Sequence, residues 1–366
     1  MTIYYLLVSL ILIFPFSMYL YYSNHLYCLY SKNIIFKFGR KKISSDKIYI
    51  IFIAFIMILI SGFRNLNIGN DTIAYYKLYT LYSNMNLIDI INMDLKEPGF
   101  YILSSLCGSL GMSYRFFLLT VAMLYICAVS FIIYKYSYIS WFSYLVFIGI
   151  GMMTFGMTAI RQTLAISFTL ITYYKLDTGK IFQSLLFMII AYLCHVTAVV
   201  FLPTYFLIKL SLNKRNLFLM IVICVLIYLN KAEIINFFVT NNTNDYTPTE
   251  TGGVITYAFY LITIFISFFL TKKNILKSNI FFMALMVLVL WPVMSFHPAV
   301  FRLGNYYSIF FIILIPNMIK SMIDDLEKNV GYIFCFFYVL LMLFMFFYNV
   351  LGSNSAFVPY IFGGGL

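Results

Sequence analysis

Long apolar stretches, separated by short hydrophilic breaks, run along the whole chain and constrain its fold more than any other feature. Of the 366 residues, 63% are hydrophobic and only 10% are charged, whereas about 25% of a typical soluble domain is charged. A helix needs about 20 apolar residues to cross a bilayer. We therefore predict an all-α, polytopic transmembrane helical bundle that forms a single integral membrane domain over residues 1–366.

The apolar runs predict about 10–12 membrane segments. They cover residues 2–22, 48–62, 99–112, 116–134, 139–158, 160–174, 182–208, 216–230, 254–271, 279–295, 303–320 and 330–350.

Two of these runs have lengths that do not suit one simple crossing. Residues 99–112 are short and end at Gly108 and Gly111, whereas residues 182–208 are too long for one span and too short for two. We expect re-entrant or half-depth helices at both places, and in the second run we expect two segments that meet near His195. Non-helical backbone at that depth is tolerated only where protein or a wet cavity surrounds it.

The distribution of basic residues predicts the orientation. The net charge is +12, but the basic residues lie in short breaks between spans, as the positive-inside rule requires, and so do not indicate nucleic-acid binding. The break after the first run is strongly basic and is expected in the cytoplasm, which places residues 63–98 outside. Its charged residues are Lys32, Lys37, Arg40, Lys41, Lys42, Lys47 and one acid, Asp46.

Motifs for metals and cofactors are missing from the sequence. The six cysteines are scattered without a Cys-x-x-Cys pair, which argues against a zinc site or a disulfide framework. Neither a phosphate-binding loop nor a dinucleotide fingerprint occurs. We expect no metal, no cofactor and no nucleic-acid partner.

Three arginines are expected near the outer face. Arg64 follows the second apolar run, Arg161 lies where one span ends outside and the next begins, and Arg302 lies in the outer break 296–303. Guanidinium groups stay charged and bind phosphate oxygens in a bidentate manner, so together they indicate a site for a multiply charged anion. Arg64 alone is also consistent with an interfacial anchor.

Three residues on the same side are candidates for proton transfer. His195 lies at the expected bend, and Asp71 and Glu97 lie in the outer loop. Each has a plain alternative: His195 as a hydrogen-bonded core residue, Asp71 as a helix N-cap, and Glu97 as the residue before a helix that starts with proline. His297, next to Pro298, is more typical of an ordinary turn.

The order of the short motifs resembles a known family. The chain contains Arg64 followed by Gly69-Asn-Asp71, then Tyr75-Tyr76, Glu97-Pro98-Gly99-Phe100, Ile160-Arg161-Gln162, His195-x-Thr197-Ala198 and Arg302-x-x-x-Tyr306. This order resembles the EpsG family of exopolysaccharide and O-antigen polymerases, one branch of the Wzy group.

The resemblance implies a glycosyltransferase that polymerises oligosaccharide repeat units linked to undecaprenyl pyrophosphate. The reaction takes place at the outer leaflet of a bacterial inner membrane, by block transfer with release of undecaprenyl pyrophosphate. It implies a lipid-linked oligosaccharide substrate, contact with membrane lipids, and a chain-length regulator protein as a partner. The implied substrate-binding residues are Arg64, Arg161, Arg302, Gln162, Tyr75 and Tyr306, and the base is His195, Asp71 or Glu97, in that order.

Two other functions stay open. A flippase of lipid-linked oligosaccharide shares the substrate and a charged cavity, but it should show two pseudo-repeated halves. A C-type membrane glycosyltransferase, or an acyltransferase that adds a single group to polysaccharide, would carry an acidic motif in its first outer loop, where Asp71 lies.

Overall fold

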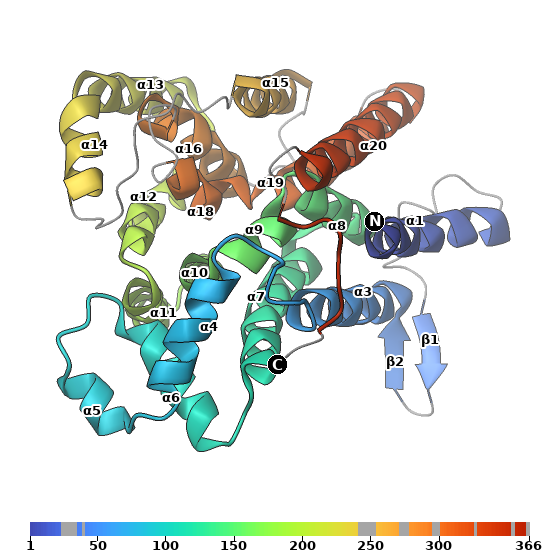
Figure 1. The fold of residues 1–366 in the computed structure, drawn as a ribbon. Coiled ribbons are helices and arrows are strands. Elements are labelled where there is room, and N and C mark those ends of the chain that lie inside the picture. Colours follow the sequence, from blue (N-terminus) through green and yellow to red (C-terminus); the bar gives the residue numbers. More distant parts are fainter. Residues whose placement is uncertain are drawn as a thin grey trace. The chain divides into compact units, whose positions relative to one another are not determined.

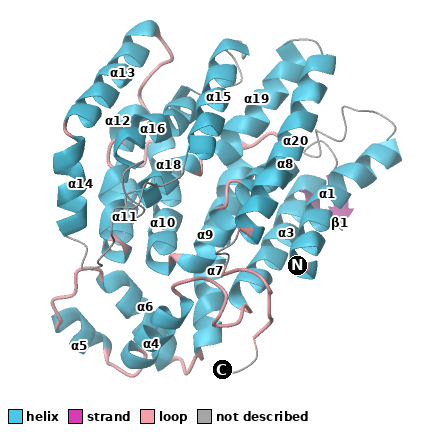
Figure 2. Ribbon diagram, turned by 45° about the horizontal axis from the view of Figure 1, so that its top comes forward, coloured by secondary structure: helices cyan, strands magenta, loops and turns pink. Residues whose placement is uncertain are grey.

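The protein is helical apart from one short hairpin. The computed structural model describes residues 1–22, 35–38, 41–240, 254–270, 278–294, 301–325, 328–352 and 356–363. Within these ranges the strands β1 (Ile35–Phe38) and β2 (Lys41–Ser44) pair antiparallel, and almost all other regular structure is helix (Figures 1 and 2). The predicted polytopic helical class is confirmed.

The chain forms two compact units. Unit 1 comprises Met1–Val199 together with Ile333–Leu366, and unit 2 comprises Val200–Tyr332. Whether the two units act as the single membrane domain expected over residues 1–366 stays a prediction.

Unit 1 contains the N-terminal helices and most of the last one. Its helices are α1 (Thr2–Tyr22), α3 (Ser45–Gly62), α4 (Thr72–Tyr82), α5 (Leu87–Asn92), α6 (Pro98–Ser109), α7 (Tyr114–Tyr136), α8 (Ser140–Gly149), α9 (Met152–Thr158), α10 (Ile160–Asp177), α11 (Ile181–Cys194) and α20 (Lys328–Leu351), the last from Ile333 onward.

Unit 2 begins within the 3₁₀ helix η2 (Val196–Phe201). It continues with α12 (Thr204–Leu207), α13 (Lys214–Leu229), α14 (Lys231–Thr240), α15 (Val254–Leu270), α16 (Ser278–Met294), η3 (Arg302–Gly304), α18 (Asn305–Ser308) and α19 (Phe311–Asp325).

Within the described residues, fewer full-length spans are found than the apolar runs predict. By length and composition, four stretches of the described chain suit a membrane crossing: Ser45–Gly62, Tyr114–Tyr136, Arg302–Asp324 and Lys328–Leu351. A fifth results if α8 and α9, bent by 55° to each other, form one span. Shorter apolar helices of 10–17 residues are also found there, among them Ile181–Cys194 and Val196–Leu207. The protein is therefore a multi-pass membrane protein in which several of the expected 10–12 segments are too short to cross alone.

The helices α10 and α11 make the most extensive contact between two helices of unit 1. The turn between them contains Gly179, whose φ of +75° suits a residue without a Cβ. Small buried side chains on α11, such as Ser184 and Ala191, let the two helices approach closely. Because the pair is antiparallel, the start of α10 and the end of α11 lie at the same end. Arg161 and His195 are each about four helical turns from the connecting turn.

The long apolar run 182–208 breaks where the sequence predicts. The helix α11 ends at Cys194, and His195 has extended backbone with φ −160° and ψ 123° before η2 begins. The run 99–112 forms the twelve-residue α6 and a turn at Gly111, whose φ is +67°. Neither segment is one continuous spanning helix, and their depth in the membrane stays a prediction.

Residues near the end of the chain return to the loop after α3. The Asn65 amide donates to the Ile361 carbonyl at 3.0 Å, and the Gly363 amide donates to the Phe63 carbonyl at 2.8 Å. We refer to residues 356–363 as the C-terminal strap, because they close this part of unit 1 with backbone hydrogen bonds.

Candidate functional site

The site is built where the start of α6 meets the end of α11. Glu97 is the residue before α6, and Pro98 takes the first helical position, where its missing amide costs nothing. A Cβ on the next residue, Gly99, would lie 2.9 Å from both the amide nitrogen and Sγ of Cys194. Only a glycine lets α6 come this close to α11, and the close approach brings Glu97 to His195.

The carboxylate of Glu97 is the centre of the site. Its Oε1 lies 2.5 Å from His195 Nδ1 and accepts the Val196 amide at 3.1 Å, while Oε2 accepts Arg161 Nη1 at 3.2 Å. The Glu97 side chain is 10% exposed, but those of Arg161 and His195 keep 21% and 23%. A buried acid therefore holds an imidazole and a guanidinium that a ligand can still reach.

Glu97 is held in its ionised form. Burial by itself raises the pKa of this carboxyl, but the opposing effects are larger in sum. The hydrogen bond and charge of His195, the amide of Val196 and the charge of Arg161 lower the pKa to about 2. A carboxylate with so low a pKa is a weak proton acceptor near neutral pH. It is well suited to orient an imidazole.

The Glu97–His195 contact determines which imidazole nitrogen is available. An ionised carboxylate accepts only, so His195 Nδ1 carries the proton that is donated to Oε1. In the neutral ring, Nε2 then has the free lone pair, and within the described part of the chain Nε2 has no hydrogen-bond partner. The same carboxylate–imidazole arrangement orients general bases in hydrolases.

Aromatic rings surround the Arg161 guanidinium. Its Nη2 donates to the Tyr101 hydroxyl at 2.6 Å, and its Cζ lies 4.9 Å from the Tyr101 ring centroid, 5.2 Å from Phe100 and 5.9 Å from Tyr75. Among the described residues, the buried Arg161 Nε has no hydrogen-bond partner. Tyr101 was not among the predicted site residues. It directly follows the Glu97–Phe100 motif, but no sequence signal distinguishes it from the many other tyrosines.

Arg64 lies in a different environment from Arg161. It is 2% exposed, and its guanidinium donates to the carbonyls of Ser61 and of Met157, the latter at 3.0 Å. Its backbone also forms a bridge with Phe362 of the C-terminal strap. In this structure Arg64 holds three segments together, so the alternative of an exposed interfacial anchor does not fit. Its predicted role in substrate binding stays a prediction.

We refer to Glu97, His195, Arg161 and Tyr101 as the Glu97 cluster. The other predicted residues of unit 1 differ in whether they contact it. Tyr75 joins it through its ring. Asp71 occupies the N-cap position of α4, one turn before Tyr75, but its side chain makes no capping hydrogen bond. Gln162 follows Arg161 and is buried, and the Tyr76 ring packs against Tyr114.

Two predicted residues belong to unit 2. Arg302 begins η3 and is half-buried, and Tyr306 in α18 is fully buried within that unit. Stacking of Tyr306 on a sugar would require its ring to become accessible. His297 lies outside the described residues.

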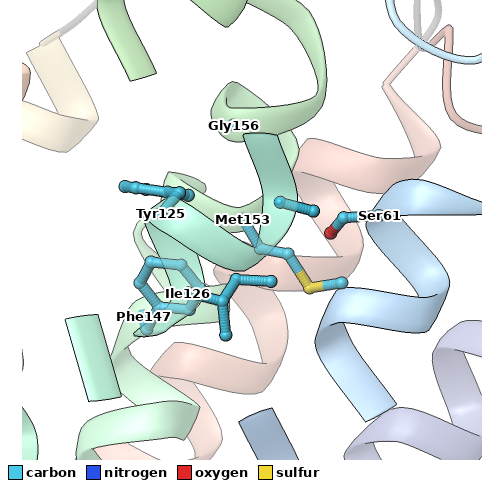
Figure 3. A pocket seen from close by; sticks show the side chains of 7 residues that line it. Ser61, Tyr125, Ile126, Phe147, Met153 and Gly156 are labelled. Carbon is cyan, nitrogen blue, oxygen red and sulfur yellow. The ribbon is translucent and has the colours of Figure 1, made fainter. Parts of the chain in front are cut away.

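A small pocket in unit 1 contains none of these residues. It lies between α3, α7, α8 and α9, and its lining is mainly apolar (Figure 3). The lining residues are Ser61, Ala122, Tyr125, Ile126, Phe147, Met153 and Gly156. No group of three or more His, Cys, Asp or Glu side chains suited to a metal ion occurs in the described ranges. The Glu97 cluster is therefore the best candidate site.

Comparison with known proteins finds one family. A family model described as "EpsG family" matches residues 47–362, which include every residue of the Glu97 cluster. No curated protein matches the chain, and no solved structure matches it.

Proposed function

Because this chain belongs to the EpsG family, we propose that it is a Wzy-type glycosyltransferase that joins lipid-linked oligosaccharide repeat units. The family indicates a polysaccharide polymerase-type function in a multi-pass membrane protein. The finer proposal is that the repeat units are carried on undecaprenyl pyrophosphate. They are joined into O-antigen, capsular or exopolysaccharide chains at the outer leaflet of a bacterial inner membrane.

One observation carries the proposal: Glu97 holds His195 and Arg161 side by side at one end of the α10–α11 pair. Transfer of a glycan from a pyrophosphate needs a base for the acceptor hydroxyl and positive charge for the leaving group. The cluster offers both within a few ångströms.

The proposed step begins when His195 Nε2 accepts the proton of the acceptor hydroxyl. The hydroxyl oxygen then attacks the anomeric carbon of the growing chain, and the bond from that carbon to the pyrophosphate oxygen breaks. The electron pair leaves with undecaprenyl pyrophosphate, and Arg161 stabilises the negative charge that develops there. Donors already in place at such a charge typically contribute about 2.7–4 kcal/mol.

Glu97 has a supporting role in this scheme. Its low pKa argues against proton abstraction, and its contacts hold the His195 tautomer and the Arg161 guanidinium in place. We therefore keep His195 as the first candidate for the base and assign Glu97 to positioning.

The direct test uses purified protein in nanodiscs with lipid-linked repeat units as the only glycan. Polymerase activity gives a ladder of products that differ by one repeat unit. Addition of a single group gives one mass increment and no ladder, and would support the decorating transferase instead.

A deletion strain separates the proposal from the flippase alternative. Without the protein, single repeat units should still reach the cell surface, while long chains disappear from electrophoresis of the surface glycan. If single units also fail to reach the outer leaflet, the flippase is favoured.

A further inference from the structure

The helix α11 has one buried face and one exposed face. Its buried residues are Ser184, Met188, Ala191 and Cys194. The helix packs on α10, beside which it lies in Figure 1, and its end at Cys194 also packs on α6. The opposite face carries large exposed apolar side chains at the spacing of a single helical stripe. They are Phe182, Leu185, Leu186, Ile189, Tyr192 and Leu193, with Phe182 89% exposed.

This stripe ends at Leu193, two residues before His195 of the Glu97 cluster. The segment Ile181–Cys194 contains no charged residue, and its fourteen residues give a helix about 21 Å long. Its last exposed side chains, Tyr192 and Leu193, lie within one turn of His195. An uncharged apolar face of this length thus ends next to the accessible imidazole of His195, which shares Glu97 with the Arg161 guanidinium.

An exposed apolar helix face in a membrane protein ordinarily meets bulk lipid, and α20 shows such a face. Ile333, Phe336, Leu340 and Phe344 are exposed along it, and α20 is long enough to cross the membrane. The α11 stripe differs in two respects. The helix is too short to cross alone, and its end carries the proposed base and lies beside the proposed anion-binding arginine.

We propose that the exposed face of α11 binds the polyisoprenoid chain of the substrate, with the pyrophosphate at Arg161. The ligand class is an amphiphile with a long branched hydrocarbon tail and an acidic head. The tail of such a molecule matches the apolar face of α11, and its acidic head matches the positive charge of Arg161 near the end of that helix. The inference rests on the proposed function, because it takes the lipid-linked glycan as the substrate.

The arrangement has a functional consequence. A tail that lies along α11 fixes the height and direction of the pyrophosphate, so that the sugar linked to it is presented to His195. Binding energy from the remote tail would then contribute to orientation at the reacting carbon.

Photocrosslinking tests the binding face directly. The photoreactive residue p-benzoylphenylalanine replaces Ile189 in one variant and Phe336 in the control, both of which are exposed. The probe is radiolabelled polyprenyl pyrophosphate without sugar, in nanodiscs with excess phospholipid. We expect labelling at position 189 to exceed that at position 336 about tenfold, and to be competed by unlabelled probe but not by phosphatidic acid. Equal labelling at both positions, or equal competition by phosphatidic acid, would overturn the inference.

A binding measurement provides a second, independent test. The double variant Leu186→Gln/Ile189→Gln should bind polyprenyl pyrophosphate about tenfold more weakly, because two apolar contacts to the tail are lost. The control Phe336→Gln/Leu340→Gln should bind like wild type. Unchanged affinity in the α11 variant would refute the binding of the tail to the exposed face of α11. Neither assay measures polymerisation, so a protein that binds the probe on α11 but makes no chains would refute the proposed function alone.

Discussion

The substitution Gly99→Ala tests the close approach of α6 to α11, which positions the site. The added Cβ would lie 2.9 Å from the Cys194 amide nitrogen and 3.0 Å from its Cα, where ordinary contacts are 3.4–4 Å. Backbone atoms cannot rotate away, so α6 and α11 must separate by about 0.5–1 Å. Overpacking of this kind costs about 1–3 kcal/mol of stability.

The same shift acts on the geometry of the site. The Val196 amide now lies 3.1 Å from Glu97 Oε1, and a separation of about 0.5–1 Å takes it beyond hydrogen-bond distance. His195 loses its fixed orientation at the same time. A misplacement of about 1 Å typically costs about a hundredfold in rate, so we expect Gly99→Ala to lower chain elongation by about that factor.

A matched control separates the site from general destabilisation. Gly108 is on the same helix, and a Cβ there would collide with the backbone carbonyl of Ser83, away from the Glu97 cluster. Elongation is measured with purified lipid-linked repeat units and divided by the amount of folded protein, with the thermal midpoint recorded alongside. Gly108→Ala should lose stability but keep its rate per folded molecule. Normal elongation by Gly99→Ala, or an equal loss in both variants, would show that the reasoning is wrong.

Three further predictions concern the cluster itself. His195→Gln should abolish elongation while polyprenyl pyrophosphate still binds, as measured by titration in nanodiscs; an active variant would transfer the role of base to Asp71 or Glu97. Arg161→Lys should lower the elongation rate about a hundredfold, or about 2–4 kcal/mol, because a point charge does not replace a planar fork; chain growth close to wild type would contradict this. Folding lowers the pKa of Glu97 from 4.5 to about 2. The ionised carboxylate therefore contributes about 3 kcal/mol to the free energy of unfolding above about pH 4.5. This contribution is lost as the pH falls toward 2. Unfolding in detergent should therefore be less acid-sensitive in Glu97→Gln than in wild type, and identical pH profiles would argue against the low pKa.

The sequence predicted the helical class and the break at His195 because both depend on local properties. Apolar run length alone shows that residues 182–208 cannot form one or two ordinary spans. The closeness of Arg161 to His195 could also have been predicted, because both residues lie about four helical turns from the basic break between their helices.

Other features depend on contacts that no local pattern encodes. The predictions grouped Arg64 with Arg161 because both were expected on the outer side, yet Arg64 is covered by residues that lie almost at the other end of the chain. Gly99 was quoted only as part of a motif, because its role comes from the Cys194 backbone, 95 positions later in the sequence. The role of Tyr101 follows from one hydrogen bond to Arg161, which composition cannot distinguish among 33 tyrosines.

The C-terminal strap has a consequence for how the protein is made. Unit 1 takes its residues from both sides of unit 2, and the Tyr360 hydroxyl bonds to the Ile60 carbonyl, 300 positions away in the sequence. During synthesis, α3 and the loop after it must therefore wait until the whole of unit 2 has left the ribosome before their last backbone partners arrive. Over that interval the amides of Asn65 and Gly69 lack their acceptors in the strap, the carbonyls of Ile361 and Ala356. We therefore expect the loop after α3 to stay accessible to proteases until translation is almost complete.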